Sequence, residues 1–108
     1  MPYIVVTTLF PYEKAPQCGE KYVEALKKYP LDESLGTDIV PSAVKLTLEG
    51  NKSIRIVEVK EGKLEEALTH ISRSITVFRG IEGFRPSIDI YYTVAEAMAI
   101  AGAEMPDQ

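Results

Sequence analysis

Hydrophobic residues recur along the chain at spacings that switch between two and about 3.6 residues, which is typical of strands alternating with helices. Residues Tyr3–Phe10 are mostly β-branched or aromatic and carry no charge, so they predict a strand buried on both faces and central in its sheet. Between Pro16 and Pro30 the spacing becomes helical, with apolar positions at Cys18, Tyr22, Leu26 and Tyr29. The chain therefore begins with a strand followed by a helix.

The next segment predicts a loop and a hairpin. Pro, Asp, Ser, Gly and Thr cluster in residues 31–42, which is typical of a long loop. Apolar and polar residues then alternate through residues 44–49 and again through residues 53–56. Gly50 and Asn51 lie between these runs and accept the positive φ angles of a tight hairpin turn, so we place the turn there.

The last part of the chain predicts a helix, a strand and a short helix. Apolar residues in the range 64–78 fall on one stripe of a helix. Residues 85–93 alternate between apolar and polar, as in a strand. Thr93 and Glu96 have the spacing of a capping box, which predicts a short helix over residues 95–101.

This order of elements predicts an α+β fold. Strand, helix, strand, strand, helix and strand form the split βαβ pattern of the ferredoxin-like fold, in which two helices cover one face of a four-stranded antiparallel sheet. Right-handed crossovers then place the first and third strands in the middle and give the spatial order 4-1-3-2. We expect one such domain over residues 1–108, with an ordered core over about 3–101 and the short C-terminal helix added to it.

Composition narrows the classes of partner. The 108 residues are 45% hydrophobic and 26% charged, as in one soluble domain, and the net charge of −4 argues against nucleic acid. The charge-free start is too short to span a membrane and lacks the features of a signal peptide. We therefore expect no membrane partner. A single cysteine cannot form an intramolecular disulfide, so we expect a cytoplasmic protein.

The topology, together with the segments 80–85 (GIEGFR) and 89–97 (DIYYTVAEA), resembles the dimeric α/β-barrel superfamily and an uncharacterised group within it. The resemblance implies a homodimer in which the bare sheet faces pack together. It also implies a choice among cofactor-free monooxygenases, muconolactone isomerases, haem-degrading enzymes and proteins without assigned activity. It carries no catalytic residue over to this chain.

Alternation along the predicted strands assigns side chains to the uncovered sheet face. We expect Lys45, Thr47 and Glu49 there from the second strand, Arg55, Val57 and Val59 from the third, and Ser87, Asp89 and Tyr91 from the fourth. A homodimer through this face would bury the two valines and let Arg55 pair with Asp89 or line an enclosed space.

Six residues near the sheet are candidates for a site. We expect Tyr3, Thr7, Arg55, Arg85 and Tyr91 to bind a ligand, with Arg55 holding an oxygen of a small organic anion or a phenolic compound. Asp89 is a candidate for proton transfer. The competing interpretation is that Arg55 and Asp89 join two subunits, or that these residues are merely exposed.

Cys18 is the only cysteine in the sequence, and His70 is the only histidine. Cys18 is either a thiol activated by the start of its helix or a small buried residue packed under Tyr22. His70 lies outside the apolar stripe and is either a boundary residue or a second catalytic candidate. No spacing of ligands predicts a metal or cofactor site, although His70 as an axial haem ligand stays open.

Three functions follow from these observations. The leading hypothesis is a cytoplasmic homodimer that binds a small organic molecule between sheet and helices or across the dimer. The first alternative is a cofactor-free monooxygenase or isomerase that uses Asp89 or His70. The second is an interaction or regulatory module that docks another protein through a sheet edge or the apolar last helix.

Overall fold

The structure is a computed structural model, and it describes residues 1–104 and 106. Its elements in chain order are β1 (Tyr3–Phe10), the 3₁₀ turn η1 (Tyr12–Lys14), α1 (Ala15–Lys28), β2 (Gly36–Thr47), β3 (Gly50–Val59), α2 (Leu64–Thr76), β4 (Arg85–Tyr91) and α3 (Val94–Ile100).

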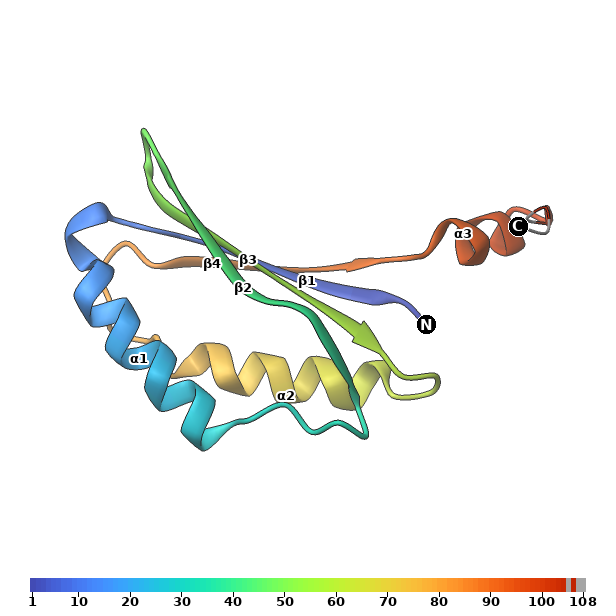
Figure 1. Ribbon diagram of the computed structural model, residues 1–108, viewed down its shortest axis with the longest axis horizontal. Coiled ribbons are helices and arrows are strands. Elements are labelled where there is room, and N and C mark those ends of the chain that lie inside the picture. Colours follow the sequence, from blue (N-terminus) through green and yellow to red (C-terminus); the bar gives the residue numbers. More distant parts are fainter. Residues whose placement is uncertain (105, 107–108) are drawn as a thin grey trace.

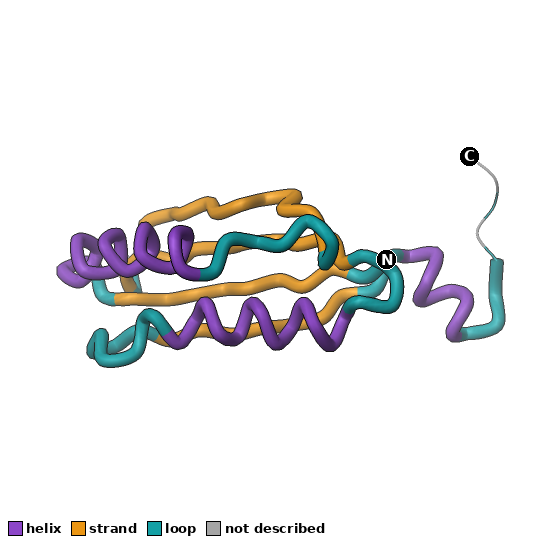
Figure 2. Tube along the Cα trace, turned by 90° about the horizontal axis from the view of Figure 1, so that it is seen from below, coloured by secondary structure: helices purple, strands orange, loops and turns teal. Residues whose placement is uncertain are grey.

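The strands form one antiparallel sheet in the order β2-β3-β1-β4, which is the predicted order 4-1-3-2 read from the other edge. The helices α1 and α2 lie side by side on one face of this sheet, as Figure 1 and Figure 2 show from two directions. The fold is therefore the predicted ferredoxin-like α+β fold, and neither α1 nor α2 covers the other face of the sheet.

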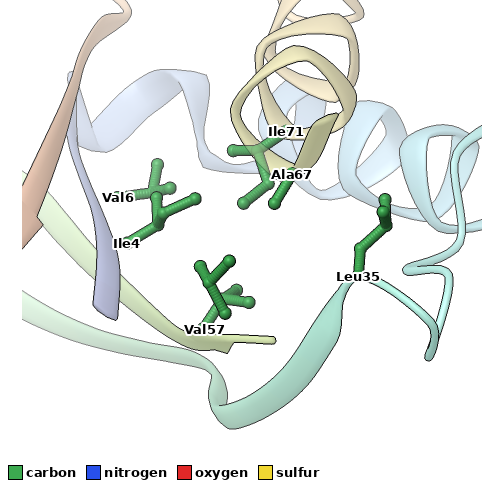
Figure 3. Close-up of a cluster of buried hydrophobic side chains, with 7 residues drawn as sticks. Ile4, Val6, Leu35, Val57, Ala67 and Ile71 are labelled. Atoms are coloured by element: carbon green, nitrogen blue, oxygen red, sulfur yellow. The ribbon is translucent and has the colours of Figure 1, made fainter. Parts of the chain in front are cut away.

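The core lies between β1, β3 and α2. Ile4 of β1 and Val57 of β3 are direct partners in the sheet, and both are fully buried. Ala67 and Ile71 of α2 pack onto them from above and are also fully buried (Figure 3). Each buried aliphatic side chain of this kind contributes about 1.5–3 kcal/mol to folding. This cluster holds α2 against one end of the sheet.

The sequence analysis places the wrong set of β3 side chains on the uncovered face of the sheet. Val57 and Val59 are fully buried under α2, and Arg55 lies on the same helix-covered face. The uncovered face receives Ile54 and Ile56 instead. Both alternating sets of β3 contain β-branched apolar residues, so alternation alone could not choose between them. The pairing of Ile4 with Val57 decides the face.

The predicted loop over residues 31–42 is also wrong in its second half, where β2 already runs from Gly36. This strand lies at the sheet edge, and its ladder shifts register between Asp38 and Val40 and again between Val40 and Ala43. Such β-bulges and an edge position tolerate Pro41, which has no N–H to donate. Loop-like composition therefore marks an irregular edge strand here.

The hairpin turns two residues earlier than predicted. Thr47 pairs with Gly50, so Leu48 and Glu49 form the turn. The Thr47 hydroxyl donates to the Gly50 carbonyl at 2.8 Å and accepts from the Glu49 N–H at 3.1 Å. Gly50 has φ 129°, and a Cβ at this position would lie 2.5 Å from the carbonyl oxygen of Phe10. The glycine is thus required by close approach to β1.

The last predicted helix forms with the predicted cap. The Thr93 hydroxyl accepts from the Glu96 N–H, and the Glu96 carboxylate accepts from the Thr93 N–H, which completes a capping box in α3. No residue of α3 is buried, and the helix extends beyond the sheet (Figure 1). Within the described residues, no helix combines the length and apolar character that a membrane crossing requires.

Candidate functional site

A cavity of about 560 Å³ lies between α1 and the sheet, beside the packed core. Strands β1, β2 and β3 form its floor, and α1 with the end of α2 forms its roof. Volumes of this order are typical of sites for small organic molecules. The cavity occupies the end of the helix-covered face that α2 does not fill.

Small residues create this space. The side of α1 that faces the sheet carries Ala15, Cys18, Gly19 and Ala25, and the floor opposite them carries Thr8 and Ser53. These side chains are short, so they fill little of the space between α1 and the sheet. A helix with Leu or Ile at the same positions would pack onto the floor, as α2 does with Ile71.

The floor of the cavity is polar along one strand. Asn51, Ser53 and Arg55 are successive inward-facing positions of β3, and all three line the cavity. Ser53 shares a hydrogen bond with the hydroxyl of Thr8, its partner in β1. Beyond Arg55 the same face of the strand becomes apolar at Val57. The change from polar to apolar positions coincides with the change from cavity to core.

Arg55 is held in the cavity by a bidentate ion pair. Its Nε donates to Oδ1 of Asp38 at 2.8 Å, and Nη2 donates to Oδ2 at 3.2 Å. The two side chains are 24% and 26% exposed, so both are partly shielded from solvent. A guanidinium has five N–H groups, which leaves three for other acceptors. The β-bulge after Asp38 belongs to the irregular part of β2 that brings this carboxylate over Arg55.

Aromatic side chains supply the rest of the wall. Tyr22 and Tyr29 line the cavity from α1. At one end of the cavity Phe84 stacks on Phe78, with ring centroids 4.7 Å apart and 6° between the planes, and on Phe10 at 6.4 Å. Flat apolar surfaces of this kind suit a planar ligand. The cavity therefore combines aromatic walls with a polar floor.

Cys18 lies in the roof of the cavity and is 5% exposed. Burial raises the pKa of this thiol above its ordinary value, because the thiolate loses its hydration. Activation by the start of the helix would lower the pKa, so the raised pKa argues against an activated thiol. The alternative of a small buried side chain on the face shared with Tyr22 agrees with the structure.

The structure separates the predicted ligand-binding residues into two groups. Arg55 lies in the cavity. The other four, Tyr3, Thr7, Arg85 and Tyr91, lie on the uncovered face, because each is a strand partner of another residue on that side. Asp89 lies there too, accepting a hydrogen bond from the Ser87 hydroxyl at 3.2 Å. Arg55 and Asp89 consequently face opposite sides of the sheet and do not pair.

His70 lies on α2 outside the cavity lining, with its ring edge against Tyr29 at a centroid distance of 6.4 Å. Its Nε2 atom is buried and finds no hydrogen-bond partner among the described residues. Asp32 lies near it, and the pKa of this carboxyl is lowered mainly by hydrogen bonds from Ser34, with a smaller contribution from His70. Neither Asp89 nor His70 touches the cavity.

Sequence reasoning missed most of the cavity. Asp38 fell in the predicted loop, and Thr8, Ser53 and Tyr22 were not singled out as site residues. One signal was present in the sequence: a central strand with Asn51, Ser53 and Arg55 at alternate positions under a helix has too many polar groups for a closed core. No cluster of three or more His, Cys, Asp or Glu side chains occurs in residues 1–104 and 106 that could hold a metal ion.

Comparisons with known proteins add a distant structural likeness. No family model matches the sequence, and no curated protein matches it either. A search of solved structures finds a NIPSNAP family protein of unknown function from Agrobacterium tumefaciens strain C58. It is 11% identical, with a TM-score of 0.40, and the match covers 86% of this chain and 90% of the other. A likeness of this degree assigns neither a family nor a function to this chain.

Proposed function

We propose that this protein binds a small, largely apolar organic molecule in the cavity between α1 and the sheet. The observation that carries the proposal is the row of Asn51, Ser53 and Arg55 on the helix-covered face of β3. Ser53 is already hydrogen-bonded to Thr8, and Arg55 keeps three N–H groups beyond its pair with Asp38. A polar group of a bound molecule can accept a hydrogen bond from these N–H groups, while its apolar part occupies the cavity.

The ion pair favours an uncharged ligand over an anion. Asp38 already neutralises the charge of Arg55 through two hydrogen bonds. A second carboxylate would leave one negative charge uncompensated in a partly buried site, which is unfavourable. A phenolic hydroxyl suits the pair better, since its oxygen accepts from Arg55 and its proton donates to the carboxylate of Asp38. Of the two ligand classes expected from the sequence, the phenolic one therefore has more support.

The walls favour an aromatic ring system. Tyr22 and Tyr29 form one side, and the stacked rings of Phe78 and Phe84 lie at the end. A two-ring phenol fits within a cavity of 560 Å³ and leaves the remaining space to water. We therefore choose 2-naphthol as the neutral probe and 2-naphthoate as its anionic analogue.

The test is a fluorescence titration of both probes against the protein and the variant Arg55→Met. We expect 2-naphthol to bind more tightly than 2-naphthoate. The variant should bind 2-naphthol about tenfold more weakly, because a hydrogen bond from a charged donor contributes about 1.5–3 kcal/mol. Arg73→Met on the exposed side of α2 is the matched control and should change nothing.

Two results would contradict the proposal. Equal affinity of 2-naphthol for Arg55→Met and for the unchanged protein would mean that the cavity floor does not hold the probe. Loss of binding in Arg85→Met alone would place the site on the uncovered face, where the sequence placed most of its candidates.

A further inference from the structure

The β2–β3 hairpin ends in an exposed apolar tip. Val44 and Leu46 of β2 lie on the same side of the sheet as their partners Ser53 and Asn51, and they are 61% and 64% exposed. Leu48 follows in the turn and is fully exposed. The hairpin extends away from the helices at its end of the sheet (Figure 1). We call Val44, Leu46 and Leu48 the apolar row of the hairpin.

The fold does not require leucine at the tip. Neither Leu48 nor Glu49 has a positive φ angle, so polar residues fit this turn as well. Leu48 contributes nothing to the core, because its side chain is fully exposed. Single exposed apolar residues are common, but here Leu46 and Val44 extend the apolar surface as far as the cavity, which Val44 lines. A continuous apolar row on a projecting hairpin indicates contact with another molecule.

Two lysines lie on the other side of the hairpin. Lys45 and Lys52 are strand partners, and both are exposed. They stand three and four residues from Leu48, which places them about 10 Å behind the tip at about 3.3 Å per residue. Arg85 extends this basic row across the sheet, since Arg85 and Lys52 both pair with Leu9. Basic groups are therefore set back from an apolar tip.

The hairpin is basic although the chain is acidic. The net charge of the chain is −4, yet residues 44–52 carry two lysines and one glutamate. At the opposite end of the sheet the loop after β3 meets the segment before β2, where the Lys60 N–H donates to the Leu35 carbonyl. The residues near that end are mostly acidic, since Lys60 and Lys63 are outnumbered by Asp32, Glu33, Glu58, Glu61, Glu65 and Glu66. Such a separation of charge turns the hairpin toward a negatively charged surface.

We propose that the hairpin tip docks this protein on the surface of an anionic lipid bilayer. Leu48 and Leu46 enter the boundary between headgroups and acyl chains, about 5–10 Å deep, and Lys45 and Lys52 meet the phosphates. The distance of about 10 Å between the tip and the lysines matches this depth. The expectation of no membrane partner came from the lack of a spanning segment, and surface docking needs no such segment.

A bilayer fits this tip better than a protein surface does. A protein partner needs a pocket shaped for the projecting Leu48, whereas fluid acyl chains accommodate any apolar side chain. Mobile anionic headgroups likewise gather around Lys45 and Lys52 without a fixed geometry. Glu49 is the feature of the tip that opposes contact, because its carboxylate lies beside the phosphates. The inference goes beyond ligand binding and does not depend on what the cavity holds.

The experiment is co-sedimentation of the full chain with vesicles of phosphatidylcholine alone or of phosphatidylcholine mixed equally with phosphatidylglycerol. We expect binding to the mixed vesicles, and added salt should weaken it. Leu48→Ser should bind about tenfold more weakly, because the leucine side chain is no longer buried in lipid. Lys52→Gln should bind about fivefold more weakly to the mixed vesicles, and Glu49→Gln should bind several-fold more tightly.

Two matched controls lie at the other end of the molecule. Ile100→Ser removes an apolar side chain of α3 that is 70% exposed, and Lys60→Gln removes an exposed lysine after β3. Neither should change vesicle binding. Leu48→Ser should leave the circular dichroism and the binding of 2-naphthol in solution unchanged, because Leu48 does not line the cavity.

A fluorescent reporter locates the contact directly. The sequence contains no tryptophan, so Leu48→Trp places a single indole at the tip. Its emission should shift to shorter wavelength when mixed vesicles are added, and brominated lipids should quench it. Ile100→Trp should show neither effect.

Four results would overturn the proposal. A protein that stays in solution with the mixed vesicles would mean that the apolar row contacts a protein partner instead. Equal losses in Leu48→Ser and Ile100→Ser would mean that the tip is not the docking site. Binding that ignores Lys52→Gln and Glu49→Gln would mean that headgroup charge is not recognised. Unchanged emission of vesicle-bound Leu48→Trp would show that the tip stays outside the bilayer.

Discussion

The helix-covered face of the sheet has two ends built from the same two strands, and they differ in what the helices bring to them. At one end Ile4 and Val57 are closed off by Ile71 of α2. At the other, Thr8 and Ser53 face α1 across a cavity. We call these the packed end and the cavity end. The strands are continuous through both, so the difference lies in side-chain size and polarity and not in the backbone.

One small fold thus holds both a core and a cavity on the same face of its sheet. The packed end anchors the sheet to α2 through fully buried aliphatic residues. The cavity end can therefore carry polar groups without loss of the fold, because stability is supplied a few residues away. Local departures from a closed core are expected where a protein binds something.

The largest predicted effect contrasts two isoleucines one turn apart on α2. Ile71→Ala at the packed end should lower the free energy of unfolding by about 3 kcal/mol, as for other fully buried aliphatic residues. Ile75→Ala, beside the cavity, should cost about 1 kcal/mol, because the side chain already faces unfilled space. Urea denaturation of both variants measures the difference. Equal losses would mean that the cavity end is packed like the core.

The next effect concerns the charge at the cavity end. Asp38→Asn should make 2-naphthoate bind about tenfold more tightly, since the guanidinium of Arg55 is then free to pair with the ligand carboxylate. The affinity for 2-naphthol should fall or stay the same. Parallel titrations of the two probes test this reversal of preference. A variant that still prefers 2-naphthol over 2-naphthoate would show that Asp38 does not set the ligand charge.

The sequence predicts the topology behind these two predictions, but it does not predict the inward face of β3 or the cavity. The charge-free run of β1 correctly predicts a central strand, although only its helix-covered side is buried and not both faces as expected. The apolar stripe of α2 correctly predicts an amphipathic helix. The inward face of β3 was not determined, since Ile54, Ile56, Val57 and Val59 make both faces apolar. The cavity could not be predicted either, because it depends on small residues of α1 meeting small residues of two strands that are distant in sequence.

A smaller effect is expected at the cavity roof. Gly19 lies inside α1, and a Cβ built on it meets no heavy atom within 4 Å. Gly19→Ala should therefore stabilise the protein by about 0.5–1 kcal/mol through its greater helix propensity. Thermal unfolding measures the gain, and 2-naphthol binding should stay within twofold. A destabilised variant would mean that α1 approaches the floor more closely than described.

The smallest effect is kinetic and concerns Cys18. The raised pKa leaves less thiolate in the folded protein, so iodoacetamide should react with it several-fold more slowly at pH 8 than in the urea-unfolded chain. Because the folded pKa lies above the unfolded value, burial of the thiol favours folding below about pH 9, and this contribution is lost as the pH rises further. Mass spectrometry follows the alkylation. Equal rates in both states would contradict a buried thiol, whereas slower labelling with 2-naphthol present would tie Cys18 to the occupied cavity.

A titration of the ¹⁵N-labelled protein with 2-naphthol, followed by amide chemical shifts, directly tests whether the cavity binds this ligand. We predict saturable shifts at Thr8, Ser53 and Arg55 on the cavity floor and along α1, with small changes at Ser87 and Asp89. Shifts concentrated in β4 on the uncovered face of the sheet, or none that saturate, would contradict a ligand site at the cavity end.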